Sequence, residues 1–107
     1  MAEVNADVQE IIHRFLRRLN QEGIHVEEAY LYGSYAKRTE DKWSDIDVAI
    51  ISPDFSRDRF EEGVRLMQIS SDVDPHIEPV PFTPDTFVDE NPLVWEIKKT
   101  GILIKVK

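Results

Sequence analysis

The sequence contains no cysteine. This absence excludes disulfide bonds, a thiolate nucleophile and zinc sites built on thiolates. Basic residues are also scarce, since 13 Lys and Arg stand against 21 Asp and Glu, which gives a formal net charge of −8. Non-specific binding to nucleic acid needs many Lys and Arg side chains to displace counterions. The composition therefore argues against nucleic acid as the default partner and leaves it open only as a substrate.

Long apolar runs are missing too. The amino-terminal region is amphipathic and acidic at its start, and it resembles neither a signal peptide nor a membrane span. We therefore expect a soluble, cytoplasmic protein. A chain of 107 residues can build one hydrophobic core but not two, so residues 1–107 are expected to form a single domain without a separate substrate domain.

The first half of the chain alternates between helical and extended patterns. Apolar residues recur at spacings of three and four over residues 4–19, which predicts an amphipathic helix that ends before Gly23. Residues 26–32 and 45–51 have the character of strands. The second of these is apolar almost throughout, as expected of an inner strand covered on both faces. A further helix follows, for which Ser56 is a candidate cap; its apolar positions are Phe60, Val64, Met67 and also Leu66.

The second half predicts two more strands. Residues 76–82 alternate as a strand, but Pro79 and Pro81 cannot donate ladder hydrogen bonds, so one long side should be unpaired. Helices are expected to start at residues 83–85 and at 91–92, each with a proline in its first turn. A last strand covers residues 102–106. The order helix, strand, strand, helix, strand, helix, strand predicts an α/β (α+β) fold in which helices pack on a mixed sheet.

Residues 31–51 contain the polar residues most suggestive of chemistry. Asp45 and Asp47 lie two positions apart at the start of a strand, so their side chains point to the same face. Two close carboxylates disfavour joint ionisation unless a cation or hydrogen-bond donors compensate. Magnesium usually takes one or two protein carboxylates together with phosphate and water oxygens. This pair therefore predicts a site for a metal ion and a phosphate-bearing ligand.

A Gly-Ser pair supplies a phosphate site of its own. Gly33 follows a strand, where it lets the backbone turn sharply and approach a ligand closely. Ser34 adds a hydroxyl group, and the start of a helix would add free N–H groups. Lys37 and Arg38 are either phosphate ligands or surface cations. A role for Ser34 as a nucleophile is disfavoured, because no G-x-S-x-G elbow surrounds it.

The combination of Gly33-Ser34, ten intervening residues, and Asp45-x-Asp47 resembles the signature of the DNA polymerase beta-type nucleotidyltransferase superfamily. Within it, the short chain is similar to the minimal nucleotidyltransferases. The resemblance implies that the Gly-Ser turn holds the triphosphate of an NTP and that the two aspartates carry the metal ions, here two Mg²⁺. Family members often have glycine at the position of Arg38.

A third carboxylate is expected to complete the metal site, and Glu78, Asp74 and Asp72 compete for this role. Asp72 and Asp74 lie in a turn-like segment beside Pro75, where acidic residues are usual for local reasons. Glu78 lies in a strand and can face the same side of the sheet as the aspartates. Many members of the resembled family carry an acidic residue on a strand here, so Glu78 is the favoured ligand.

These residues predict transfer of an NMP, most simply AMP from ATP, to a hydroxyl acceptor. The resemblance implies a small helical HEPN-domain protein as partner, with a tyrosine of that toxin-like protein as acceptor and an antitoxin role for this chain. The alternative is a binding module that neutralises a partner by contact, with weak catalysis or none. Because so short a transferase has no domain to cover its site, we also expect it to associate with itself or a partner through an apolar surface.

Overall fold

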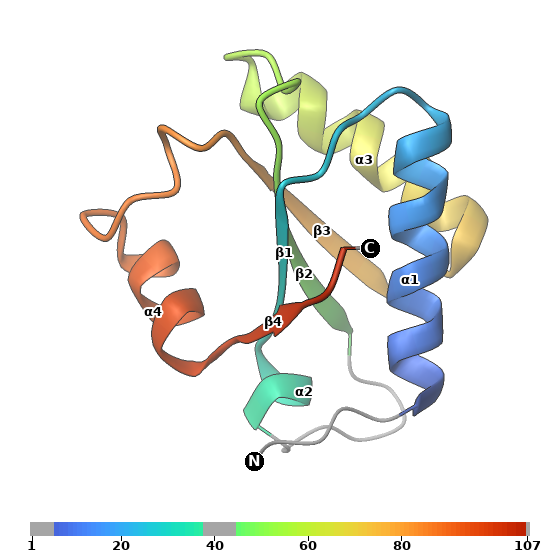
Figure 1. Cartoon of the computed structure of the whole chain (residues 1–107), viewed down its shortest axis with the longest axis horizontal. Coiled ribbons are helices and arrows are strands. Elements are labelled where there is room, and N and C mark those ends of the chain that lie inside the picture. The colour runs from blue at the N-terminus through green and yellow to red at the C-terminus, as the bar shows by residue number, and fades with distance from the viewer. Residues whose placement is uncertain (1–5, 38–44, 107) are drawn as a thin grey trace.

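A mixed four-stranded sheet forms the centre of the computed structural model, which describes residues 6–37 and 45–106 (Figure 1). The strand order is β3-β2-β1-β4. Strand β1 is antiparallel to both β2 and β4, whereas β2 and β3 are parallel. The strands are β1 (Glu28–Tyr32), β2 (Ile46–Ile51), β3 (Ile77–Phe82) and β4 (Ile102–Ile104). The predicted α/β fold with a mixed sheet is confirmed.

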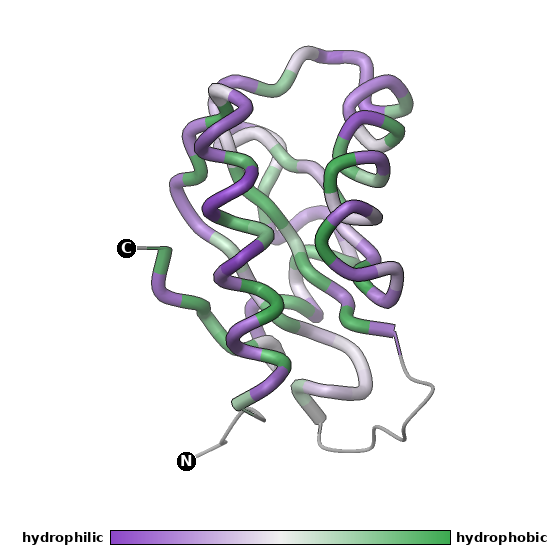
Figure 2. Tube along the Cα trace, turned by 90° about the vertical axis from the view of Figure 1, so that its right-hand side faces the viewer, coloured by the Kyte–Doolittle hydropathy of each residue, from purple (hydrophilic) through white to green (hydrophobic). Residues whose placement is uncertain are grey.

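Helices cover both faces of the sheet. Helices α1 and α3 lie side by side on one face, and α4 packs against the other (Figures 1 and 2). The helices are α1 (Ala6–Gln21), α2 (Ser34–Lys37), α3 (Arg59–Val73) and α4 (Pro92–Thr100). In the part of the chain that is described, no helix is both long and apolar enough to cross a membrane.

Strand β2 is the inner strand that its apolar sequence predicts. Val48 and Ile50 are fully buried and join the core beneath α1 and α3. Ala49 and Ile51 point the other way and join the core beneath α4. Because successive side chains of a strand alternate between faces, the odd-numbered residues of β2, including Asp47, lie on the α4 face.

Strand β3 is an edge strand, which confirms the prediction from its prolines. The carbonyls of His76 and Phe82 accept hydrogen bonds from the N–H groups of Ile46 and Ser52, at 2.8 and 2.9 Å. Even-numbered residues of β3 thus direct their backbone groups toward β2. Pro79 and Pro81 occupy the opposite positions, so the two missing N–H groups belong to the outer edge. An edge without these donors is a poor template for a further strand.

The prediction for helix α3 is wrong in part. Helix α3 has Asp58, not Ser56, as its N-cap, and the Asp58 side chain accepts from the N–H of Glu61 at 3.0 Å. Leu66 is fully buried as predicted, but the other three expected apolar positions are exposed: Phe60 by 82 %, Val64 by 43 % and Met67 by 41 %. The sheet instead buries a different stripe of the helix, made of Glu62, Leu66, Ile69 and Ser70.

The prediction that a helix starts directly after β3 is also wrong. Residues 83–85 form no helix. Instead the Thr83 hydroxyl donates to Asp85 and the Thr83 N–H donates to the Thr86 hydroxyl oxygen, which closes a compact turn. The predicted end of the first helix and start of the last helix are confirmed, whereas residues 4 and 5 of the predicted first helix lie outside the described residues. Gly23 follows α1 with a φ of +83°, and Asn91 caps α4, whose first turn contains Pro92.

Candidate functional site

The Gly-Ser turn lies directly against the second aspartate. Strand β1 ends at Tyr32, Gly33 adopts a φ of +73°, and α2 begins at Ser34. A Cβ atom built on Gly33 would overlap Oδ2 of Asp47 and lie 3.2 Å from its Cγ. Both the left-handed backbone and the lack of space therefore require glycine here. The structure thus brings together the two halves of the motif that ten residues separate in the sequence.

Three polar side chains form a row across neighbouring strands. The register pairs Tyr32 of β1 with Asp47 of β2, and Asp47 with Glu78 of β3. Residues directly opposite each other lie on the same face of a sheet, at about 4.5–5.5 Å between side-chain Cβ atoms in antiparallel pairs. All three are partly buried. The expectation that Glu78 lies beside the Asp45–Asp47 segment, on the same face, agrees with this placement.

Within this row, the surroundings of Asp47 raise the pKa of its carboxylate. Burial raises the pKa of Asp47, and the nearby carboxylates of Asp45 and Glu78 raise it further. Asp45 is exposed and directly precedes β2. A carboxylate that is desolvated beside two like charges is stabilised by a cation. A cation bound beside Asp47 would therefore lower its pKa and stabilise its ionised form.

Sequence reasoning missed two residues of this neighbourhood. Burial raises the pKa of Tyr32 to about 12, with further contributions from the carboxylates of Asp47, Glu78 and Glu96. The Tyr32 hydroxyl hence stays protonated at neutral pH and can act as a donor. Glu96 comes from α4, so a fourth acidic side chain influences the row from above the sheet. Tyr32 directly precedes Gly33, but its place opposite Asp47 depends on the strand register. Glu96 lies on α4, far from the motif in sequence, so no local pattern marks it.

The carboxylates of this site suit Mg²⁺ if phosphate and water oxygens complete its coordination shell. Across residues 6–37 and 45–106, no three His, Cys, Asp or Glu side chains converge closely enough to enclose a metal ion. These described residues therefore form no metal cage by themselves. Asp45 and Asp47 nonetheless offer two hard oxygen ligands on one face. That is the number Mg²⁺ commonly takes from a protein when phosphates and water complete its shell.

The other predicted site residues lie in different parts of the structure. Lys37 ends α2, and Arg38 lies outside the described residues. Helix α2 is a single turn, so it offers backbone N–H groups but little dipole. Asp72 contacts Arg18 at 3.1 Å, and Asp74 contacts the His76 ring at 2.9 Å. These two carboxylates thus have partners outside the row, which leaves Glu78 as the better third candidate.

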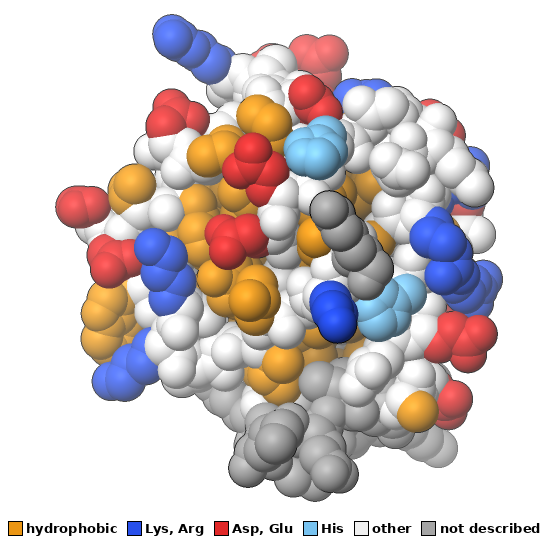
Figure 3. All heavy atoms as spheres, viewed as in Figure 1, with side chains coloured by type: hydrophobic (Ala, Val, Ile, Leu, Met, Phe, Trp, Pro, Cys, Tyr) orange, Lys and Arg blue, Asp and Glu red, His pale blue; other side chains and the backbone are white. Residues whose placement is uncertain are grey.

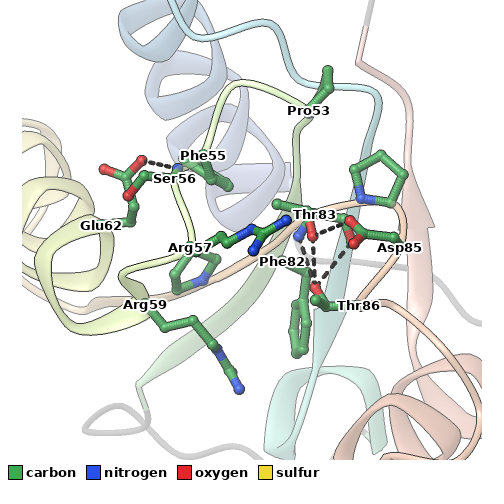
Figure 4. Close-up of a pocket in the computed structure, with 12 residues that line it drawn as sticks. Pro53, Phe55, Ser56, Arg57, Arg59, Glu62, Phe82, Thr83, Asp85 and Thr86 are labelled. Atoms are coloured by element: carbon green, nitrogen blue, oxygen red, sulfur yellow. Dashed lines mark hydrogen bonds between the residues drawn. The ribbon is translucent and has the colours of Figure 1, made fainter.

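A separate hollow of about 570 Å³ lies at the other end of the sheet (Figure 4). It opens beyond the carboxyl ends of β2 and β3, whereas Asp47 and Glu78 lie near the amino ends. Two of its acidic side chains have partners within the hollow: Glu62 accepts from the N–H of Ser56 at 2.6 Å, and Asp85 accepts from the Thr83 hydroxyl. The Arg59 guanidinium lies over the Phe82 ring, 5.4 Å from its centroid. The hollow is thus distinct from the row formed by Tyr32, Asp47 and Glu78.

The surface charge agrees with the composition. On the face seen in Figure 3, acidic side chains lie among exposed apolar surface in the region of α4, and Lys and Arg side chains are scattered. A nucleic-acid backbone site needs clustered basic side chains. This face presents no such cluster.

Comparison with known proteins assigns the class. The profile of the Nucleotidyltransferase domain family matches residues 10–101, which include the Gly-Ser turn, both aspartates and Glu78. The chain belongs to this family. The general activity of the family is nucleotidyl transfer, and the chain is accordingly a nucleotidyltransferase-domain protein. No curated protein sequence matches it significantly.

Two solved structures share the fold. A proposed nucleotidyltransferase from Sulfolobus solfataricus superposes with a TM-score of 0.62 at 14 % identity, over 91 % of this chain and 78 % of the other. A toxin-antitoxin structure with AMP-PNP superposes with a TM-score of 0.58 at 23 % identity, over 91 % of this chain and 72 % of the other. At these identities the likeness establishes a common fold.

Proposed function

We propose that the protein transfers an NMP, most simply AMP from ATP, to a hydroxyl acceptor in a reaction that requires Mg²⁺. The contact between Gly33 and Asp47 is the observation that carries this proposal. It supports the proposal because the Gly-Ser turn, whose N–H groups would suit a phosphate, lies against a partly buried carboxylate, which would suit Mg²⁺. The AMP-PNP in the toxin-antitoxin neighbour supports the choice of an adenine nucleotide.

Each residue has a role in this proposal. The backbone N–H groups at Gly33 and Ser34 and the Ser34 hydroxyl bind the triphosphate, with Lys37 and Arg38 as further cationic ligands. Asp45 and Asp47 hold two Mg²⁺ ions, and Glu78 is the third carboxylate. Magnesium, when bound, neutralises phosphate charge and lowers the pKa of a coordinated hydroxyl.

The transfer itself is a substitution at the α-phosphorus. The acceptor oxygen forms a bond to this phosphorus, the bond to the bridging oxygen of the β-phosphate breaks, and pyrophosphate leaves. Glu78 receives the proton of the acceptor hydroxyl. General-base catalysis of this kind contributes about 10²–10⁴-fold to a rate.

The acceptor in this proposal is a tyrosine on a small helical HEPN-domain partner, which would make the protein an antitoxin. The toxin-antitoxin neighbour supports a toxin as partner. The exposed acidic surface is consistent with a protein acceptor in preference to nucleic acid.

The test is calorimetric titration of ATP, with and without Mg²⁺, into the wild type, Asp45→Asn and Asp47→Asn, together with transfer of labelled AMP to candidate partners. We expect binding only with Mg²⁺ and no transfer by either variant, while the circular dichroism spectrum is unchanged. Equal binding with and without Mg²⁺ would contradict the proposal. Partner neutralisation that survives both substitutions would identify a binding module that acts by contact.

A further inference from the structure

Helix α3 carries an apolar stripe that nothing in the described chain covers. Phe60, Val64 and Met67 are exposed and lie at spacings of four and three, which places them on one face of the helix. A hollow of about 760 Å³ runs along this face and is bounded by Pro79 of the edge strand. Phe60, at the amino-terminal end of this stripe, is 82 % exposed, and a large apolar side chain exposed beside other apolar side chains is typical of an interface.

A glycine in the same helix points to the same conclusion. Gly63 lies inside α3, where glycine destabilises a helix relative to alanine. A Cβ atom built there would have no atom within 4 Å. No contact within the described residues thus explains the missing side chain. Close approach of a second backbone from outside would explain it.

We propose that α3 pairs with α3 of a second copy of this chain, antiparallel, about a two-fold axis beside Gly63 and Val64. In this arrangement Phe60 of one copy lies level with Met67 of the other, and the Gly63 residues face each other. Strand addition is not available as an alternative mode on this side, because Pro79 and Pro81 remove donors from the outer edge of β3.

Charge complementarity selects a second copy as the occupant. Glu61 and Arg65 are both exposed and flank the stripe on one side; one guanidinium nitrogen of Arg65 also donates to the Glu22 carbonyl at 3.3 Å, and the other N–H groups of Arg65 can pair across the interface. The same two-fold axis brings Glu61 of each copy within about one helical position of Arg65 of the other, so two opposite-charge pairs form per dimer. A surface that satisfies its own charges in this way is self-complementary, as a two-fold interface requires.

Multi-angle light scattering of the purified full chain across a concentration series tests the proposal. Val64→Glu should weaken the dimer by about 100-fold or more, since each dimer would bury two unpaired carboxylates. Val88→Glu is the matched control, because Val88 is exposed to a similar degree, 40 %, but lies outside α3. This variant should dimerise as the wild type does. A monomer at every concentration, or equal effects of the two variants, would overturn the proposal and leave the face to another protein.

Two further variants separate an interface from an internal role. Gly63→Ala should raise the melting temperature of the dilute monomer, because alanine favours the helix, and at the same time weaken the dimer. A dimer of undiminished affinity would contradict close approach at Gly63. Glu61→Arg and Arg65→Glu should each weaken the dimer, and the double variant should restore it. Failure of the double variant to restore the affinity would refute this pairing of charges.

Discussion

Replacing Gly33 by alanine probes the contact that joins the two halves of the site. The φ of +73° costs an alanine about 1–2 kcal/mol. The new Cβ would also overlap Oδ2 of Asp47, so the carboxylate must leave its rotamer, which costs a further 0.5–1.5 kcal/mol or so. The free energy of unfolding should fall by about 1.5–3.5 kcal/mol. At about 4 °C per kcal/mol for a domain of this size, the melting temperature should fall by roughly 6–14 °C.

Gly23→Ala is the matched control. Gly23 has a φ of +83°, but a Cβ there meets no atom within 4 Å, so only the backbone term of about 1–2 kcal/mol applies. Urea denaturation of both variants measures the difference, which is the cost of displacing Asp47. This extra cost should disappear when Gly33→Ala is combined with Asp47→Ala. Equal losses for Gly33→Ala and Gly23→Ala would refute the predicted contact.

Three other predictions concern the row formed by Tyr32, Asp47 and Glu78. The pKa of Asp47 is raised in the folded state, so its contribution to stability is complete below the ordinary value of 3.8 and is lost as pH rises through the folded pKa. Urea denaturation should therefore show that Asp47→Asn stabilises the metal-free protein at neutral pH but not in acid. Glu78→Gln should lower the rate of AMP transfer by about 100-fold or more, with nucleotide affinity little changed by calorimetry, whereas Asp72→Asn and Asp74→Asn should transfer at the wild-type rate. Ultraviolet titration should find one tyrosine ionising near pH 12, and Tyr32→Phe should remove this transition.

Much of the site could be predicted because its elements are local. A glycine after a strand and two aspartates at the start of the next strand are readable from spacing alone. The face of Glu78 was also predictable, since alternation fixes which side chains share a side. Its register opposite Asp47 was not predictable, because it depends on how two strands separated by a helix align.

The burial of α3 could not be predicted because two of its stripes are apolar. Phe60, Val64 and Met67 satisfy the helical period as well as Leu66 and Ile69 do. The sequence pattern cannot state which stripe faces the sheet. The structure buries the stripe that includes Glu62, whose carboxylate accepts from the N–H of Ser56 and ties the preceding loop to the helix. A buried glutamate with a local backbone partner is not visible in a hydrophobic pattern.

The parallel pairing of β2 and β3 sets the order in which the protein can acquire its site during folding. Asp47 and Glu78 become neighbours only after the chain has crossed from one strand to the other through α3. Contacts between distant segments form late, because the loop between them must first be closed. The hairpin of β1 and β2 can bring Gly33 and Asp47 together earlier. A partly folded chain that contains only the β1–β2 pair would hold the Gly-Ser turn beside Asp47 but would lack Glu78 at this position.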